Sequence, residues 1–112
     1  DRPGAEGTME ISEFQKLMYE LYAHNDRRRG GKATMLWLVE EIGELAEAIR
    51  REEQENIEEE LADCFAWIGA LANLYGVNLE EAFLKKYPGG VPPAGKNPVY
   101  VLTEFSVSLF SL

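Results

Sequence analysis

Hydrophobic residues recur every three or four positions along most of the chain, and this spacing is typical of amphipathic helices. From Met9 to about Tyr22 the pattern predicts a first helix. The polar, cationic, glycine-bearing segment 24–32 predicts a connecting loop. Thr34 is a plausible N-cap for a second helix that runs to about Arg51.

A third predicted helix, from about Asn56 to Tyr75, is hydrophobic on nearly every side, and Gly76 is placed to end it. A helix that is apolar all round is buried, so we expect it to contact its own subunit and a second one. One side carries large residues. The opposite side, which we expect to form the subunit contact, carries small ones: Ala62, Ala66, Gly69 and Ala70.

Asn78 and Glu81 have the spacing of a capping box, which predicts a fourth helix through Lys86. The C-terminal tail has only a weak alternating pattern, so we expect it to be irregular or weakly β. The sequence therefore predicts an all-α, four-helix bundle-type fold that is completed by oligomerisation. The expected organisation is a flexible arm (1–8), a helical domain (9–87) and a tail packed on the domain or on a partner subunit (88–112).

Length and charge narrow the class of protein. The chain has 112 residues, the size of one domain, and a net charge of −9, whereas a nucleic-acid-binding surface is basic. It has neither a membrane-length apolar run nor the pattern of a signal peptide. The single cysteine, Cys64, excludes an internal disulfide and favours a cytoplasmic location. We therefore expect no nucleic-acid or membrane partner.

The negative charge is concentrated in one window. Eleven of the 20 acidic residues lie between Glu40 and Asp63, where the basic residues are Arg50 and Arg51. Outside this window the chain is neutral, so any function that depends on negative charge is expected within it.

Four carboxylates in this window have spacings that can form a metal site. Residues three apart on a helix share a face, so Glu41 and Glu44 can face Glu60 and Asp63 if the second and third helices pack antiparallel. Oxygen donors of this kind suit Mg²⁺ or Mn²⁺. The competing interpretation is that these acids simply form a solvent-exposed helix face. Glu60, however, lies on the side of the third predicted helix that carries the large apolar residues, where an unpaired carboxylate is costly.

Other chemistry is less well supported. A di-iron bundle needs a Glu-x-x-His motif on each of two helices, and the one histidine, His24, lies in the predicted loop. Trp37 lies on the acidic side of its helix and is a candidate for stacking on a nucleobase. Lys32, with the arginines at 27–29, can contact phosphates or form a solvated basic loop.

The motif Glu40-Glu41-x-x-Glu44, followed by Glu60-x-x-Asp63, resembles the MazG-like, all-α nucleoside triphosphate pyrophosphohydrolases. The segments that carry the resemblance are 37–48, 58–63, 70–73 and 76–82, within about residues 11–87. The resemblance implies a homodimer or homotetramer. It also implies Mg²⁺-dependent hydrolysis of a (deoxy)nucleoside triphosphate to monophosphate and pyrophosphate.

By the same resemblance the metal ligands are Glu41, Glu44, Glu60 and Asp63, and Lys86 reaches a phosphate. A further arginine found in relatives is replaced by Pro88-Gly89-Gly90. Because a carboxylate free of the metal can accept a proton from water, Glu40 or Glu44 is the expected general base. The alternative function is a non-enzymatic acidic module that binds a protein partner.

Overall fold

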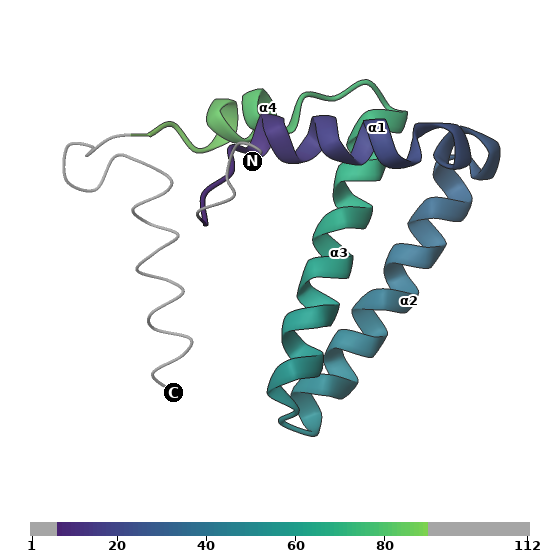
Figure 1. Ribbon diagram of the computed structural model, residues 1–112, viewed down its shortest axis with the longest axis vertical. Coiled ribbons are helices and arrows are strands. Elements are labelled where there is room, and N and C mark those ends of the chain that lie inside the picture. Colours follow the sequence, from purple (N-terminus) through teal and green to yellow (C-terminus); the bar gives the residue numbers. More distant parts are fainter. Residues whose placement is uncertain (1–6, 90–112) are drawn as a thin grey trace. The chain divides into compact units, whose positions relative to one another are not determined.

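The structure is a computed structural model that describes residues 7–89. Within these residues it is all-helical, which confirms the predicted fold class (Figure 1). The helices are α1 (Ile11–Arg29), α2 (Gly31–Arg50), α3 (Gln54–Leu74) and α4 (Leu79–Lys86). They fall into two parts, one that ends at Leu79 and one that begins at Glu80. The weak strand pattern and most of the predicted arm lie outside the described residues, so the domain boundaries stay predictions.

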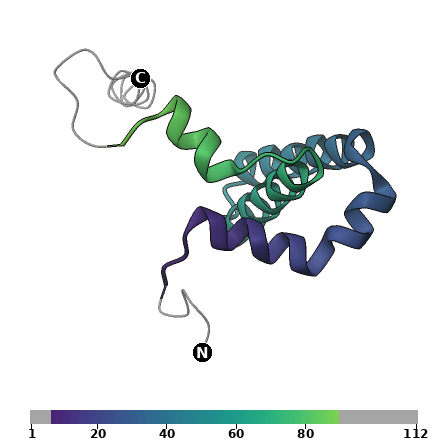
Figure 2. The ribbon, with the colours of Figure 1, turned by 90° about the horizontal axis from the view of Figure 1, so that it is seen from above.

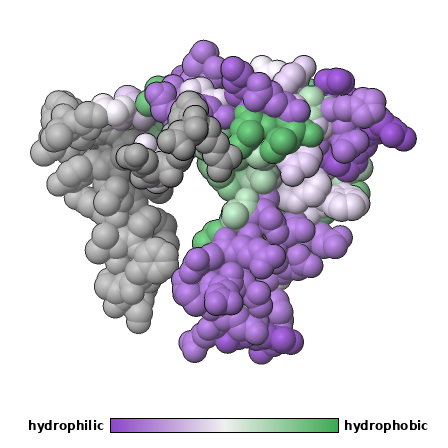
Figure 3. Space-filling model, viewed as in Figure 1, coloured by the Kyte–Doolittle hydropathy of each residue, from purple (hydrophilic) through white to green (hydrophobic). Residues whose placement is uncertain are grey.

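Helices α2 and α3 form an antiparallel pair joined by a short turn, and α1 crosses the pair where α2 begins and α3 ends (Figures 1 and 2). At the turn, Glu52 has a left-handed backbone (φ 55°), and the N–H of Glu53 donates to the carbonyl of Ala48 at 3.1 Å. On the face seen in Figure 3, hydrophobic residues gather where α1 crosses α3, and the turn end of the pair is hydrophilic. The antiparallel pair brings the two acidic motifs face to face.

The core lies where α1 meets α3. Phe14 of α1 is buried and stacks on Phe65 of α3, with ring centroids 4.1 Å apart. It also packs directly on Gly69, where an added Cβ would lie 2.7 Å from the Phe14 ring. This close contact explains why a residue without a side chain stands at position 69.

The predicted loop at 24–32 is wrong, because α1 continues through Arg29 and the break is confined to Gly30. Gly30 has φ 84°, a conformation that favours glycine, and its N–H donates to the carbonyl of Asp26 at 2.8 Å. The arginines at 27–29 occupy the last turn, where positive charge is favourable to the helix dipole. A cationic segment therefore ends a helix here instead of interrupting it.

Thr34 is not the N-cap of α2, which begins three residues earlier at Gly31. Its side chain is fully buried within the helix, and its hydroxyl donates to the carbonyl of Gly30 at 2.7 Å. The same hydroxyl accepts a hydrogen bond from Nε of Arg29 at 2.8 Å. Thr34 therefore joins the start of α2 to the end of α1.

The predicted end of α3 is confirmed, since Gly76 follows the helix with φ 64°. The N–H of Val77 donates to the carbonyl of Ala72 at 2.9 Å, which is the bond of a Schellman motif. The prediction that the small residues of this helix form a subunit contact is wrong in part, because Gly69 and Ala70 are buried inside the chain. Three of the large residues are instead exposed on α3: Leu61 at 52%, Phe65 at 49% and Ile68 at 41%.

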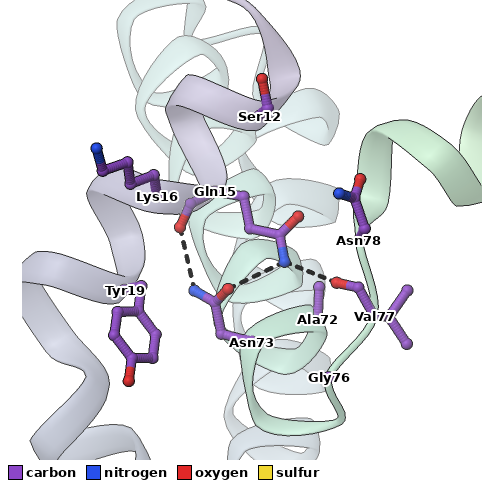
Figure 4. A pocket seen from close by; sticks show the side chains of 9 residues that line it. All are labelled: Ser12, Gln15, Lys16, Tyr19, Ala72, Asn73, Gly76, Val77 and Asn78. Carbon is purple, nitrogen blue, oxygen red and sulfur yellow. Dashed lines mark hydrogen bonds between the residues drawn. The ribbon is translucent and has the colours of Figure 1, made fainter.

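Gln15 of α1 fixes the segment that leads from α3 to α4. Its Nε2 donates to Oδ1 of Asn73 (3.0 Å) and to the carbonyl of Val77 (2.7 Å), as Figure 4 shows. Its Oε1 accepts from the N–H of Leu79 at 2.9 Å, which satisfies a donor of the first turn of α4. None of the four helices in the described part of the chain has the length and hydropathy to span a membrane.

Candidate functional site

Three carboxylates from the two acidic motifs converge between α2 and α3. One oxygen each from Glu41, Glu60 and Asp63 lies within 4.8 Å of the others. Glu41 comes from α2, and Glu60 and Asp63 come from adjacent turns of α3. The antiparallel packing of the helices thus brings together residues that are 22 positions apart in sequence.

The cluster has unsatisfied hydrogen-bonding capacity. Oε2 of Glu41 and Oε2 of Glu60 are buried and have no hydrogen-bond partner in the described part of the chain. Buried carboxylate oxygens are costly unless they are paired or bind a metal ion. Because the donors are all hard oxygens, a divalent cation of the Mg²⁺ or Mn²⁺ class fits this group of side chains.

Burial and the neighbouring carboxylates together raise the pKa of Glu41 to about 7. Burial is the largest cause, and the nearby carboxylates of Glu60 and Glu44 add to it. A bound cation would remove this repulsion by balancing the charge. Without one, the protein holds Glu41 in an environment that disfavours the ionised form.

The other predicted site residues of the acidic window lie around this cluster. Glu44 is close enough to Glu41 to affect its pKa, but it does not belong to the group of three. Glu40 is exposed on α2. Cys64 is buried, and burial together with the surrounding carboxylates raises the pKa of its thiol. The thiol therefore stays protonated and is a poor nucleophile.

One helical turn from the carboxylates, two tryptophans meet. Trp37 precedes Glu41 by four residues and Trp67 follows Asp63 by four, so each shares a helix face with its carboxylate. The two indole rings are tilted by 50°, with centroids 5.6 Å apart. Trp37 remains 53% exposed, so it has surface available for a ligand.

Arg29 also contacts Trp67. Its guanidinium carbon is 4.7 Å from the centre of the Trp67 ring, and Nη2 forms an ion pair with Oδ1 of the buried Asp26. With the bond from Nε to Thr34, three neighbours hold this side chain. The sequence grouped Arg29 with the solvated arginines 27 and 28. The spacing of Asp26 and Arg29, three residues apart on a helix, is the signal that separates it from them.

Besides a small cavity of about 210 Å³ lined by Asp26 and Arg27, two larger cavities border α1 and α3. The first, of about 330 Å³, is lined by Asp63, Trp67 and Arg29 together with side chains from α1 and α3, and it therefore adjoins the carboxylate cluster. The second, of about 420 Å³, lies around Gln15 and Asn73 (Figure 4). Since no carboxylate lines the second cavity, the first is the better candidate for a ligand that also contacts the metal ligands.

The two predicted phosphate contacts are both exposed lysines. Lys32 lies in the first turn of α2, and Lys86 lies in the last turn of α4. Nζ of Lys86 is 5.8 Å from the centre of the Tyr87 ring. Lys86 belongs to the part of the chain that begins at Glu80, so its role stays a prediction.

The described part of the chain is an all-α protein in which two facing helices bring together three carboxylates that could hold a divalent cation, beside a pair of tryptophans. Residues 29–92 match the family model of the MazG nucleotide pyrophosphohydrolase domain. Because the match covers more than half of the chain and contains both acidic motifs, the protein belongs to this family, and the predicted resemblance is confirmed. No curated protein matches the chain.

Proposed function

We propose that this protein is a Mg²⁺-dependent nucleotide pyrophosphohydrolase that removes unwanted nucleotides from the cellular pool. It converts a (deoxy)nucleoside triphosphate to the monophosphate and pyrophosphate. The observation that supports this proposal best is the cluster of Glu41, Glu60 and Asp63, with two buried oxygens that lack a partner. Mn²⁺ can substitute, because it prefers the same oxygen donors.

The three clustered carboxylates would hold the cation, and Glu44 would complete the set, as the family resemblance implies. When bound, the cation neutralises phosphate oxygens and lowers the pKa of a water molecule. Hydrolysis would add a water molecule to a phosphorus of the α–β anhydride and break the bond of that phosphorus to the bridging oxygen, which leaves with the other phosphate. Glu40 or Glu44, where free of direct coordination, accepts the proton of the water.

The substrate would extend from this cluster toward the tryptophans. Trp37 is half-exposed and its ring contacts that of Trp67, which supports a nucleobase contact next to the two tryptophans. Lys32 and Lys86 are the proposed phosphate contacts, since each is an exposed cation within the residues that match the family.

A homodimer or homotetramer is also proposed. The exposed face of α3 formed by Leu61, Phe65 and Ile68 has the i, i+4, i+7 spacing of a continuous apolar stripe. Stripes of this kind mark interfaces, since a soluble monomer rarely exposes them. The same face would serve a protein partner if the chain were a non-enzymatic module, so activity is the deciding measurement.

The test is incubation of the folded protein with each (deoxy)nucleoside triphosphate and Mg²⁺, followed by assays for pyrophosphate and monophosphate. Glu60→Gln is expected to lower turnover at least a hundredfold while the helical circular dichroism signal is unchanged. Glu58→Gln is the matched control, because Glu58 is an exposed acid on the same helix. If folded wild-type protein releases no pyrophosphate from any nucleotide, the interaction module becomes the better interpretation.

A further inference from the structure

The ring of Trp67 is not close-packed on every side. Trp67 is half-buried on α3, and it lines the cavity of about 330 Å³ together with Met18 and Ala70. A side chain that borders a cavity lacks some of the contacts that restrict rotamers in a close-packed interior. The orientation of this indole therefore depends strongly on the neighbours that do touch it.

The guanidinium of Arg29 is one of these neighbours, and it is itself held in place. Its central carbon lies 4.7 Å from the centre of the Trp67 ring. Nε donates to the hydroxyl of Thr34 at 2.8 Å, and Nη2 donates to Oδ1 of Asp26, with which it forms an ion pair. Because a guanidinium is planar, bonds from two of its nitrogens fix its plane as well as its position. Arg29 therefore presents an immobilised cation to the indole, an arrangement that attracts the ring.

The ion pair between Asp26 and Arg29 is better suited to fixing a position than to stabilising the fold. Asp26 is 3% exposed and the side chain of Arg29 is 20% exposed, so both charges lose most of their hydration. Oδ2 of Asp26 is buried without a hydrogen-bond partner among the residues that the structure describes. A buried pair with an unsatisfied oxygen adds little net stability, and such pairs can instead specify one arrangement of the side chains around them.

The orientation of Trp67 in turn affects Trp37. The two indole rings are tilted by 50° with centroids 5.6 Å apart. Because Trp37 is 53% exposed, its orientation depends strongly on the ring that it packs against. Contacts therefore run without a break from the buried Asp26, through Arg29 and Trp67, to a half-exposed ring one helical turn from Glu41.

We propose that Arg29 is a positioning residue: anchored by Asp26 and Thr34, it orients Trp67 and, through Trp67, the ring of Trp37. A stacking surface that is oriented before the substrate arrives lowers the entropic cost of binding. Because Arg29 acts through the tryptophans, its effect is the same for every nucleobase. The inference rests on the proposed function, since Trp37 is the proposed nucleobase contact.

Exciton coupling between the two indoles measures their mutual orientation directly. The chain has two tryptophans, so a couplet in the far-ultraviolet circular dichroism is assigned to this pair, and Trp67→Phe, which leaves one tryptophan, defines its absence. Arg29→Met keeps an apolar stem and removes the planar cation, and it is expected to lose the couplet. Arg28→Met is the matched control, because Arg28 is exposed in the same helical turn, and it should keep the couplet. A wild type without the couplet, or a folded Arg29→Met that retains it, overturns the inference.

A second variant separates positioning from charge pairing. Arg29→Met leaves Asp26 buried without its partner, which can destabilise the fold. Asp26→Leu combined with Arg29→Met replaces the whole pair by apolar side chains, a change that is often neutral for stability. This double variant is expected to keep the helical circular dichroism and a cooperative melt but to lose the couplet. If it folds and shows the couplet of the wild type, the inference is wrong.

Kinetics distinguish positioning from a merely structural role. The double variant is expected to raise KM about fivefold for every nucleotide with kcat little changed, a factor that corresponds to ~1 kcal/mol and to the usual strength of a partly buried cation–π contact. A structural role would instead reduce the active fraction, which lowers kcat at unchanged KM and leaves the couplet intact, and that result overturns the inference. If the folded wild type hydrolyses no nucleotide, the proposed function fails, while the couplet still decides whether Arg29 orients the two tryptophans.

Discussion

Replacement of Glu41 by glutamine is expected to change stability in opposite directions with and without a divalent cation. In the metal-free protein Glu41 has a pKa of about 7 against an ordinary value of 4.5, because burial and the carboxylates of Glu60 and Glu44 disfavour its charge. Glu41→Gln removes a charge that the folded state disfavours. The variant should therefore be more stable than the wild type at pH 8 in the presence of a chelator.

The magnitude follows from the size of the pKa shift. A shift of about 2.5 pKa units corresponds to roughly 3.4 kcal/mol at 1.36 kcal/mol per unit. Glu41 is half-buried, and screening by solvent reduces this figure to about 1–2 kcal/mol. A domain of this size gains about 4 °C or more in Tm for each kcal/mol, so thermal melting resolves the effect.

The sign of the pH dependence is also set by the raised pKa. Between pH 4.5 and about 7 the folded state keeps a proton on Glu41 that the unfolded state releases. The stabilisation is complete below pH 4.5 and is lost as the pH rises through about 7. The difference in Tm between wild type and Glu41→Gln should therefore grow from pH 5 to pH 8.

Addition of Mg²⁺ or Mn²⁺ should reverse the order. A cation that binds the folded state alone adds about 2.7 kcal/mol at a hundred times its Kd, and Glu41→Gln loses this gain with its ligand. Glu58→Gln removes one exposed negative charge from the same window and should respond to the cation as the wild type does. If Glu41→Gln is the less stable protein at pH 8 in chelator, or gains as much from the cation as the wild type, the assigned cluster is wrong.

Two further outcomes test packing and assembly. Gly69→Ala should destabilise the protein by about 1–3 kcal/mol, since the new Cβ would lie 2.7 Å from the Phe14 ring. Gly43→Ala, at a site with no atom within 4 Å of the new Cβ, should be neutral or stabilising in the same thermal melt. Light scattering at micromolar concentration should give a dimer or tetramer, and Ile68→Glu should shift it toward the monomer. A monomeric wild type contradicts the proposed interface.

The sequence predicted most of the helical segments because apolar residues on the packed face of a helix recur every three or four positions. It predicted the pairing of Glu41 with Glu60 and Asp63 because a short turn between two helices makes an antiparallel pair the simplest arrangement. The extent of α1 was missed, because polar residues at a helix end resemble a loop until the ion pair between Asp26 and Arg29 is visible.

The position of Arg29 against α3 could not be predicted from spacing along the sequence. Its contact with Trp67 joins α1 to α3, and nothing in either segment alone indicates that the two side chains meet. The same limit applies to the small-residue side of α3. Residues such as Gly69 fit a subunit contact or an internal one equally well, and the presence of Phe14 in α1 decides between them.

Chemical labelling of Cys64 can report transient opening of the structure around the carboxylate cluster. The thiol is buried beside the carboxylates, its pKa is raised, and it is the single cysteine in the chain. A thiol reagent can label it only when the protein opens locally enough to admit the reagent and let the thiol ionise. The labelling rate of the unmodified protein therefore measures how often the structure opens beside the carboxylate cluster, without any engineered probe.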